Sequence, residues 1–151
     1  MSLKFRLANA AESDEIRDLV RGAYALYVPR MGREPAPMVA DYEMLIAGKH
    51  LEVTETDGNI AGILVSFARG DHLHVENVAV SGAAQGRGVG RALMDRAEEQ
   101  ARNLGLNAVE LYTNEVMEEN FPFYAALGYV ITGRAVEDGY KRVYFRKELG
   151  D

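Results

Sequence analysis

Hydrophobic and polar positions change their spacing several times along the first third of the chain. Residues 3–8 alternate between apolar and polar, which predicts a strand. From 11 to 27, apolar residues recur three and four positions apart, so a helix is predicted there. The segment 28–37 holds three prolines and a glycine and predicts a loop. A short helix is predicted over 38–47, with Gly48 as the C′ glycine that ends it.

The middle of the chain predicts a hairpin and then a strand that leads into a glycine-rich segment. The apolar runs 50–56 and 60–68 flank Asp57-Gly58-Asn59, and Asp-Gly is a strong hairpin signal. Residues 72–80 alternate and predict the next strand. The glycine-rich segment 81–90 follows directly.

Helical spacing resumes after this segment and continues to about Leu104, where Gly105 can end the helix. Its predicted buried stripe consists of Leu93, Ala97, Ala101 and Leu104. The remaining predicted elements are a strand, a helix that ends at Gly128, and two strands joined by the turn 137–139; they cover 107–113, 120–127, 129–134 and 141–148.

The predicted order of elements is β-α-α-β-β-β-α-β-α-β-β. This order indicates an α/β (α+β) fold with a mixed central sheet and helices on both faces, not a regular doubly wound domain. Within it, 72–113 should form a right-handed strand–helix–strand unit with parallel strands. The length of 151 residues predicts a single domain, 1–151.

Composition and charge narrow the class of protein. Hydrophobic residues make up 48% and charged residues 26% of the chain, which excludes a largely disordered protein. No apolar run of about 18 residues occurs, and the first residues lack the apolar core of a signal peptide, so we expect no membrane partner and a cytoplasmic location. The absence of cysteine excludes a disulfide, a thiolate metal site and a cysteine nucleophile. A net charge of −6 argues against nucleic acid as a partner.

Basic residues nevertheless gather near the C-terminus. Because they alternate with apolar residues, we interpret them as the solvated face of an edge strand. They are Arg134, Lys141, Arg142, Arg146 and Lys147.

The glycine-rich segment carries the first chemical signal. A glycine turn that enters a helix exposes unpaired N–H groups at the positive end of the helix dipole, which suits a phosphate. A Walker loop is excluded because Arg91 and Ala92 replace its Lys-Ser/Thr ending, and Arg91 also breaks the dinucleotide fingerprint. The pattern Gln-x-x-Gly-x-Gly remains, at Gln85, Gly88 and Gly90. The alternative is a turn that only tightens the packing of strand and helix.

Two segments resemble the motifs of the GNAT superfamily of N-acetyltransferases. Residues 78–93, with the glycine pattern, resemble its acyl-CoA pyrophosphate motif, and 119–129, with its Leu-Gly-Tyr ending, resemble its second motif. The predicted element order matches the family order over nearly the whole chain. The resemblance implies direct transfer of an acetyl group from acetyl-CoA, as co-substrate, to a primary amine.

The resemblance also assigns roles to individual residues. The backbone of the strand before the loop would bind the pantetheine arm, and N–H groups of the loop would hold the pyrophosphate; these residues are Val78, Ala79, Val80, Gln85, Gly86, Arg87, Gly88, Val89, Gly90 and Arg91. Tyr124 matches the tyrosine that protonates the leaving thiolate, with a core tyrosine as the alternative role. Asn120 would contact the cofactor arm, with a helix N-cap as the alternative, because Met117 stands where many members have an asparagine.

An amine must lose a proton to attack the thioester, and one strand face carries candidates for the base. His72, His74 and Glu76 are two positions apart and share a face. Glu76 is ranked before His74, because it is nearer the expected thioester. The same triplet supports a rival hypothesis of a metal-binding protein. A non-catalytic acyl-CoA sensor is a further alternative, since it would keep the loop without needing Tyr124 or Glu76.

The acceptor is expected to be a small amine or an amino-acid-like molecule, with a protein N-terminus or lysine as the alternative. In the family, the first two helices and their connection form much of the acceptor side. The candidate acceptor-binding residues here are Tyr27, Arg30, Met31 and Glu76, and an arginine would pair with a carboxylate. A homodimer is a family-level expectation.

Overall fold

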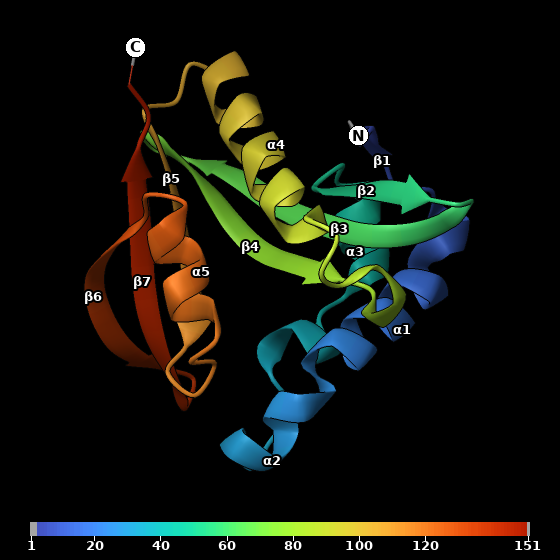
Figure 1. Cartoon of the computed structure of the whole chain (residues 1–151), viewed down its shortest axis with the longest axis horizontal. Helices are drawn as coiled ribbons and strands as arrows, with labels where there is room; N and C mark the ends of the chain where they lie inside the picture. The colour runs from blue at the N-terminus through green and yellow to red at the C-terminus, as the bar shows by residue number, and fades with distance from the viewer. Residues whose placement is uncertain (1–2, 151) are drawn as a thin grey trace. The chain divides into compact units, whose positions relative to one another are not determined.

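The computed structural model describes residues 3–150; Met1, Ser2 and Asp151, the ends of the predicted domain, lie outside the described residues. Its strands are β1 Phe5–Leu7, β2 Leu51–Thr56, β3 Asn59–Arg69, β4 His72–Val80, β5 Ala108–Asn114, β6 Val130–Glu137 and β7 Tyr140–Glu148. Its α-helices are α1 Ser13–Tyr24, α2 Val28–Met31, α3 Tyr42–Ala47, α4 Val89–Asn103 and α5 Asn120–Ala126 (Figure 1). The predicted order of elements is therefore confirmed, with α2 added.

The strands form one seven-stranded mixed sheet in the order β1-β2-β3-β4-β5-β7-β6. β4 and β5 run parallel, as predicted, from the pair His72↔Ala108 to the pair Val75↔Leu111. The pairs β1–β2, β2–β3, β5–β7 and β6–β7 are antiparallel. No helix within residues 3–150 has the length and apolarity needed to cross a membrane.

The chain divides into two compact units. The first comprises the residues up to Ser66 together with Asn77–Arg96, and the second comprises Phe67–Glu76 and the residues from Ala97 onward. β3, β4 and α4 each contribute residues to both units.

In the first unit, α1 and α3 lie on one face of β2 and β3, and the first turns of α4 lie on the other (Figure 1). The fully buried Ile16 and Val20 form the core stripe of α1, one helical turn apart. Asp41 caps α3 by accepting a hydrogen bond from the backbone N–H of Met44 at 3.1 Å. Apolar spacing and a capping side chain together account for these helices.

A bidentate ion pair links β2 to α4 in the first unit. Nε and Nη2 of Arg96 donate to the two carboxylate oxygens of Glu52 at 2.8 and 3.0 Å. Glu52 is buried, and both of its oxygens are satisfied. Removal of Arg96 would leave the buried charge of Glu52 without this compensation.

In the second unit, α5 lies against β7 (Figure 1), and aromatic rings make the contact between them. The ring of Phe145 lies 5.7 Å from that of Phe121 and 5.5 Å from that of Tyr124. On α4, the buried carboxylate of Glu98 accepts hydrogen bonds from the Tyr129 hydroxyl at 3.1 Å and from Lys147 Nζ at 3.0 Å. These contacts link α4 and the end of segment 119–129 to β7.

The predicted loop 28–37 is wrong in part. Val28–Met31 forms the short helix α2, and Ala36–Val39 forms a 3₁₀ turn. Pro29 is compatible with α2 because the first turn of a helix leaves its N–H groups unpaired. Gly32, at φ 70°, ends α2.

Gly48 was expected to be the left-handed residue that ends α3, but it has φ −79° and Lys49 takes the positive φ of 63° instead. A Cβ at Gly48 would lie 2.7 Å from Cδ2 of His50. Glycine is therefore required here by a close approach. Asp57 and Gly58 do have the positive φ angles of the predicted hairpin turn, 54° and 82°.

Two further expectations are corrected. Leu104 is 61% exposed, because α4 ends at Asn103 and leaves Leu104 outside the buried stripe. Of the basic residues interpreted as an edge-strand face, Arg134 lies on the edge strand β6, but the other four lie on β7, which pairs with both β5 and β6. Basic residues of β7 meet acidic partners: Arg146 pairs with Asp71, Glu110 and Glu148, and Lys147 pairs with Glu98.

Gly62→Ala is expected to destabilise the fold. A Cβ at Gly62 would lie 2.9 Å from Leu93 Cδ1, 3.0 Å from Val89 Cγ1 and 3.2 Å from the Ala79 carbonyl oxygen, so α4 would have to move away from β3. We expect a loss of about 1–3 kcal/mol in the free energy of unfolding, measured by urea denaturation. The matched control is Gly133→Ala on β6, which has nothing within 4 Å and should change stability by less than about 0.5 kcal/mol. Equal effects of the two substitutions would show that close packing at Gly62 is not the cause.

Candidate active site

The glycine-rich connection lies in the first unit between β4 and α4. It contains a 3₁₀ turn at Gly82–Ala84, and α4 begins at Val89. Gly86 and Gly88 both have φ 80°, and an added Cβ would meet nothing within 4 Å at either position. Glycine is thus needed here for backbone conformation, since side chains are strained at such angles.

The N-terminus of α4 is suited to an anion. The Gly88 carbonyl accepts the first helical hydrogen bond, from Ala92 N at 3.1 Å, so the N–H groups of Val89, Gly90 and Arg91 have no acceptor within the helix. The first turn holds no acidic side chain to offset the helix dipole. Arg87 and Arg91 are exposed, and no carboxylate of residues 3–150 pairs with them. The helix end and these two arginines thus carry uncompensated positive charge.

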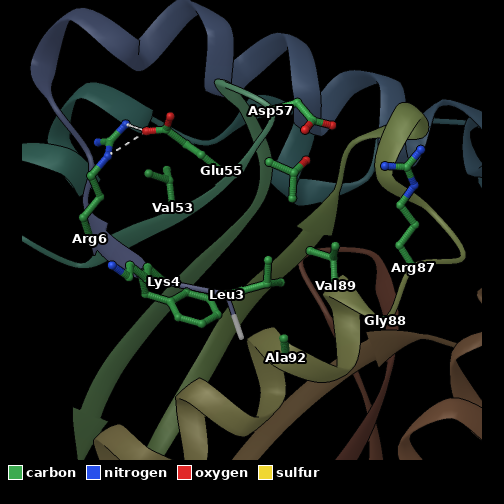
Figure 2. Close-up of a pocket in the computed structure, with 12 residues that line it drawn as sticks. Leu3, Lys4, Arg6, Val53, Glu55, Asp57, Arg87, Gly88, Val89 and Ala92 are labelled. Carbon is green, nitrogen blue, oxygen red and sulfur yellow. Dashed lines mark hydrogen bonds and ion pairs between the residues drawn. The ribbon is translucent and has the colours of Figure 1, made fainter. Parts of the chain in front are cut away.

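A pocket of about 780 Å³ opens beside this connection, within the first unit (Figure 2). Arg87, Gly88, Val89 and Ala92 form one wall, and residues of β1 and β2 and their flanks form the other. Arg6 on the far wall is neutralised by Glu12 and Glu55. The size falls in the range of small-molecule pockets. Three of the predicted cofactor-binding residues thus line a ligand-sized cavity.

The residues of β4 that precede the loop alternate in burial. Val78 and Val80 are half-buried, whereas Asn77 and Ala79 are buried. Asn77 accepts a hydrogen bond from the Tyr24 hydroxyl at 2.8 Å and donates one to the Tyr42 hydroxyl at 3.1 Å. This network anchors the end of β4 to α1 and α3.

In the second unit, Glu76 is the centre of a polar cluster. Its Oε2 lies 3.1 Å from Nε2 of His74, and its Oε1 accepts a hydrogen bond from the Tyr112 hydroxyl at 3.2 Å. Arg69 Nη2 lies 3.9 Å from Oε2. The hydrogen bond with His74 is the main cause that holds the pKa of Glu76 below its ordinary value of 4.5, against the opposing effect of burial. Glu76 is therefore ionised at neutral pH.

Exposure separates the two candidate bases. The Glu76 side chain is 35% exposed, whereas that of His74 is 7% exposed. Glu76 can thus meet a ligand, with His74 packed behind it. Sequence reasoning missed Tyr112, whose only sequence signal is that it follows Glu110 by two residues on the more polar face of an alternating strand.

His72 faces different partners. Its Nδ1 lies 3.1 Å from Asp71 and its Nε2 lies 3.6 Å from Glu110. No group of three or more His, Asp or Glu side chains within residues 3–150 is arranged to hold a metal ion. The triplet that motivated the metal hypothesis is therefore split between two sets of contacts.

Tyr124 and Asn120 lie on α5 in the second unit. Tyr124 is 9% exposed, and its ring contacts those of Phe123, Tyr129 and Phe145 at 5.0, 6.0 and 5.5 Å. Asn120 is the first residue of α5 and not its N-cap, which is Glu119. The Asn120 side chain instead donates to Thr113 Oγ1 at 3.0 Å, so the N-cap alternative is wrong.

Three of the four predicted acceptor-binding residues lie in or beside α2 in the first unit, whereas Glu76 lies on β4 in the second unit. Tyr27 is buried, and the Arg30 guanidinium lies 5.3 Å from the centre of its ring. Met31 is half-buried at the end of α2. The structure thus brings these three residues onto one short stretch of helix.

Comparison with known proteins gives the family. The model of the acetyltransferase (GNAT) family matches residues 14–129. Nourseothricin acetyltransferase is 30% identical, with a TM-score of 0.61; the match covers 65% of this chain and 64% of that chain, less than two thirds of its length.

Two further structures match nearly the full length. Ard1 from Thermoplasma volcanium has a TM-score of 0.76 and 17% identity, with 100% of both chains covered. yncA from Salmonella typhimurium, solved with its cofactor acetyl-CoA, has a TM-score of 0.73 and 19% identity, with 100% of this chain and 96% of that chain covered. At these identities the two matches show a shared fold. The fold, the glycine-rich entry to α4 and the family match together place this chain in the GNAT family of acetyltransferases.

Proposed function

We propose that the protein is a single domain that transfers an acetyl group from acetyl-CoA directly to a primary amine. The transfer takes place in a ternary complex of the protein with both substrates. The observation that carries the proposal is the uncompensated N-terminus of α4 after the left-handed Gly86 and Gly88. Free N–H groups and two unpaired arginines fit a pyrophosphate. That a fold neighbour was solved with acetyl-CoA supports the choice of co-substrate.

Glu76 is proposed to take the proton that the amine loses. Its carboxylate is ionised and partly exposed, and it accepts the proton directly or through a water molecule. A carboxylate of low pKa is a weak base toward a free ammonium ion. The proton is therefore transferred to Glu76 in the step in which the amine nitrogen forms its bond to the thioester carbon, because this bond makes the nitrogen more acidic. His74 supports Glu76 and is not the first acceptor.

Tyr124 is proposed to be the acid. As the new C–N bond forms and the C–S bond breaks, the sulfur leaves as a thiolate and takes a proton from the phenol. The ordinary pKa values of phenol and thiol are close enough for this transfer. The aromatic packing around Tyr124 holds its ring in place.

The acceptor is proposed to be a small amine or an amino-acid-like molecule, with Tyr27, Arg30 and Met31 on its binding side. The short helix α2 supports this choice, because it presents an arginine and a methionine around a buried tyrosine. An arginine in this setting can pair with a substrate carboxylate.

The proposal is tested by isothermal titration of the metal-free protein with acetyl-CoA, followed by assays of CoA release with a panel of primary amines. We expect micromolar binding and amine-dependent release. Tight binding of zinc with no binding of acetyl-CoA would overturn the proposal in favour of a metal protein. Binding without release for every amine would instead indicate an acyl-CoA sensor.

Gly88→Val is expected to weaken acetyl-CoA binding at least about tenfold. A β-branched residue is strained at φ 80°, so the turn and the N–H groups of α4 would be displaced. Isothermal titration gives the dissociation constant. Gly82→Val is the matched control, because Gly82 is also exposed and unobstructed but lacks a positive φ. Unchanged affinity in Gly88→Val would argue against the phosphate role of the loop.

Tyr124→Phe is expected to lower kcat about 100-fold, because the substitution removes the acid and keeps the ring. The dissociation constant for acetyl-CoA should stay within about twofold of the wild-type value. Tyr140→Phe provides the control, since Tyr140 is equally buried, at 9% exposure. Wild-type turnover in Tyr124→Phe would remove Tyr124 from the mechanism.

Glu76→Gln is expected to lower kcat/KM about 100-fold, by the same factor at pH 6 and at pH 8. The pKa of Glu76 lies below 4.5, so the carboxylate is fully ionised over this whole range and its loss has one constant effect. Steady-state kinetics at both pH values measure the ratio. Glu110→Gln, which alters a half-buried carboxylate on β5, is the control. A loss confined to higher pH would contradict the lowered pKa, and no loss would exclude Glu76 as the base.

A further inference from the structure

We propose that Tyr112 is a positioning residue for the acetyl-transfer reaction: its hydroxyl holds the Glu76 carboxylate in the orientation in which it accepts the proton. This inference rests on the proposed function, in which Glu76 is the base. Tyr112 was not among the residues predicted from sequence or from the family resemblance.

The two carboxylate oxygens of Glu76 have separate partners on the two sides. Tyr112 donates to Oε1 at 3.2 Å from β5, and Nε2 of His74 lies 3.1 Å from Oε2 on β4 itself. Each oxygen can accept more than one hydrogen bond, so both keep capacity for a further donor. Two fixed contacts therefore set the carboxylate plane while its exposed part stays available to an amine or a water molecule.

Tyr112 is itself held in place from three sides. Its ring stacks on His74 at 5.6 Å with an interplanar angle of 26°. The Arg142 guanidinium lies 4.2 Å from its centre, and the ring of Tyr144 lies at 5.7 Å. Arg142 pairs in turn with Glu137 at 3.4 Å. A ring confined in this way has one orientation for its hydroxyl, which is what a positioning group requires.

The charges around Glu76 support the same role. The titratable and charged groups that face its carboxylate are His74 on β4, Tyr112 on β5 and Arg69 on β3. Burial raises the pKa of Tyr112 to about 12, with a further contribution from the Glu76 charge. The phenol therefore stays protonated and remains a donor at any pH at which the enzyme would work. A hydrogen bond donated to the ionised form also helps to keep the pKa of Glu76 low.

The test is a double-mutant cycle between Tyr112→Phe and Glu76→Gln, with amine acetylation as the assay. Tyr112→Phe keeps the ring packing and removes only the donor. We expect kcat to fall about tenfold with the KM for acetyl-CoA within about twofold of wild type. In the Glu76→Gln background, the same substitution should change kcat less than about twofold, because Tyr112 acts through Glu76.

A second readout does not depend on turnover. In protein labelled with ¹³C at glutamate carboxyls, the Glu76 signal is identified by its absence in Glu76→Gln. Its pKa should rise in Tyr112→Phe, because the ionised form loses a donor. Tyr140→Phe is the matched control: it removes the hydroxyl of another buried tyrosine, on β7, and should leave both readouts unchanged.

Either of two results would overturn the inference. One is an active wild-type enzyme in which Tyr112→Phe keeps its kcat within about twofold. The other is a Glu76 pKa that does not move in Tyr112→Phe. Failure of the wild-type enzyme to acetylate any amine would be a different result, since it would remove the proposed function itself.

Discussion

The unpaired backbone N–H groups at the start of α4 are the constraint on which the other features of this chain depend. Two glycines at φ 80° turn the chain so that the helix begins at Val89 with its first N–H groups available. The close contact of Val89 and Leu93 with Gly62 then fixes the helix on β3. A larger residue at any of these glycines would move the same helix end. The backbone conformation of the two loop glycines and the packing at Gly62 therefore both determine the position of the electropositive start of α4.

β4 carries Glu76, the proposed base, and leads into the glycine-rich connection. Glu76 and Val78 are two residues apart on the same strand, so their side chains share a face. His74 and Tyr112 fix the carboxylate, and the network of Asn77 with Tyr24 and Tyr42 fixes the strand next to it. The strand is therefore constrained at consecutive residues, by polar contacts on one side and by buried hydrogen bonds on the other. Such support is what holds a reactive group in a single geometry.

Local sequence signals predicted much of this fold. The Asp57-Gly58 hairpin, the strand 72–80 and the helix that begins at Asn120 all lie where the pattern placed them, because each depends on residues close together in the chain. α2 was missed because Pro29 usually marks a loop, yet it is tolerated in the first turn of a helix. The interior position of β7 was missed because strand order is set by long-range pairing, which alternation alone does not reveal. Tyr112 was missed for the same reason: its partnership with Glu76 exists only in the parallel register of β4 and β5.

The most direct test of the central claim is to follow the backbone amides of residues 86–91 by ¹⁵N–¹H NMR while CoA is added. Amides that bind the pyrophosphate should show the largest shifts in the protein, and pantetheine, which lacks the pyrophosphate, should leave them almost unmoved. Equal responses to CoA and pantetheine, or CoA-induced shifts that spare residues 86–91, would contradict the account.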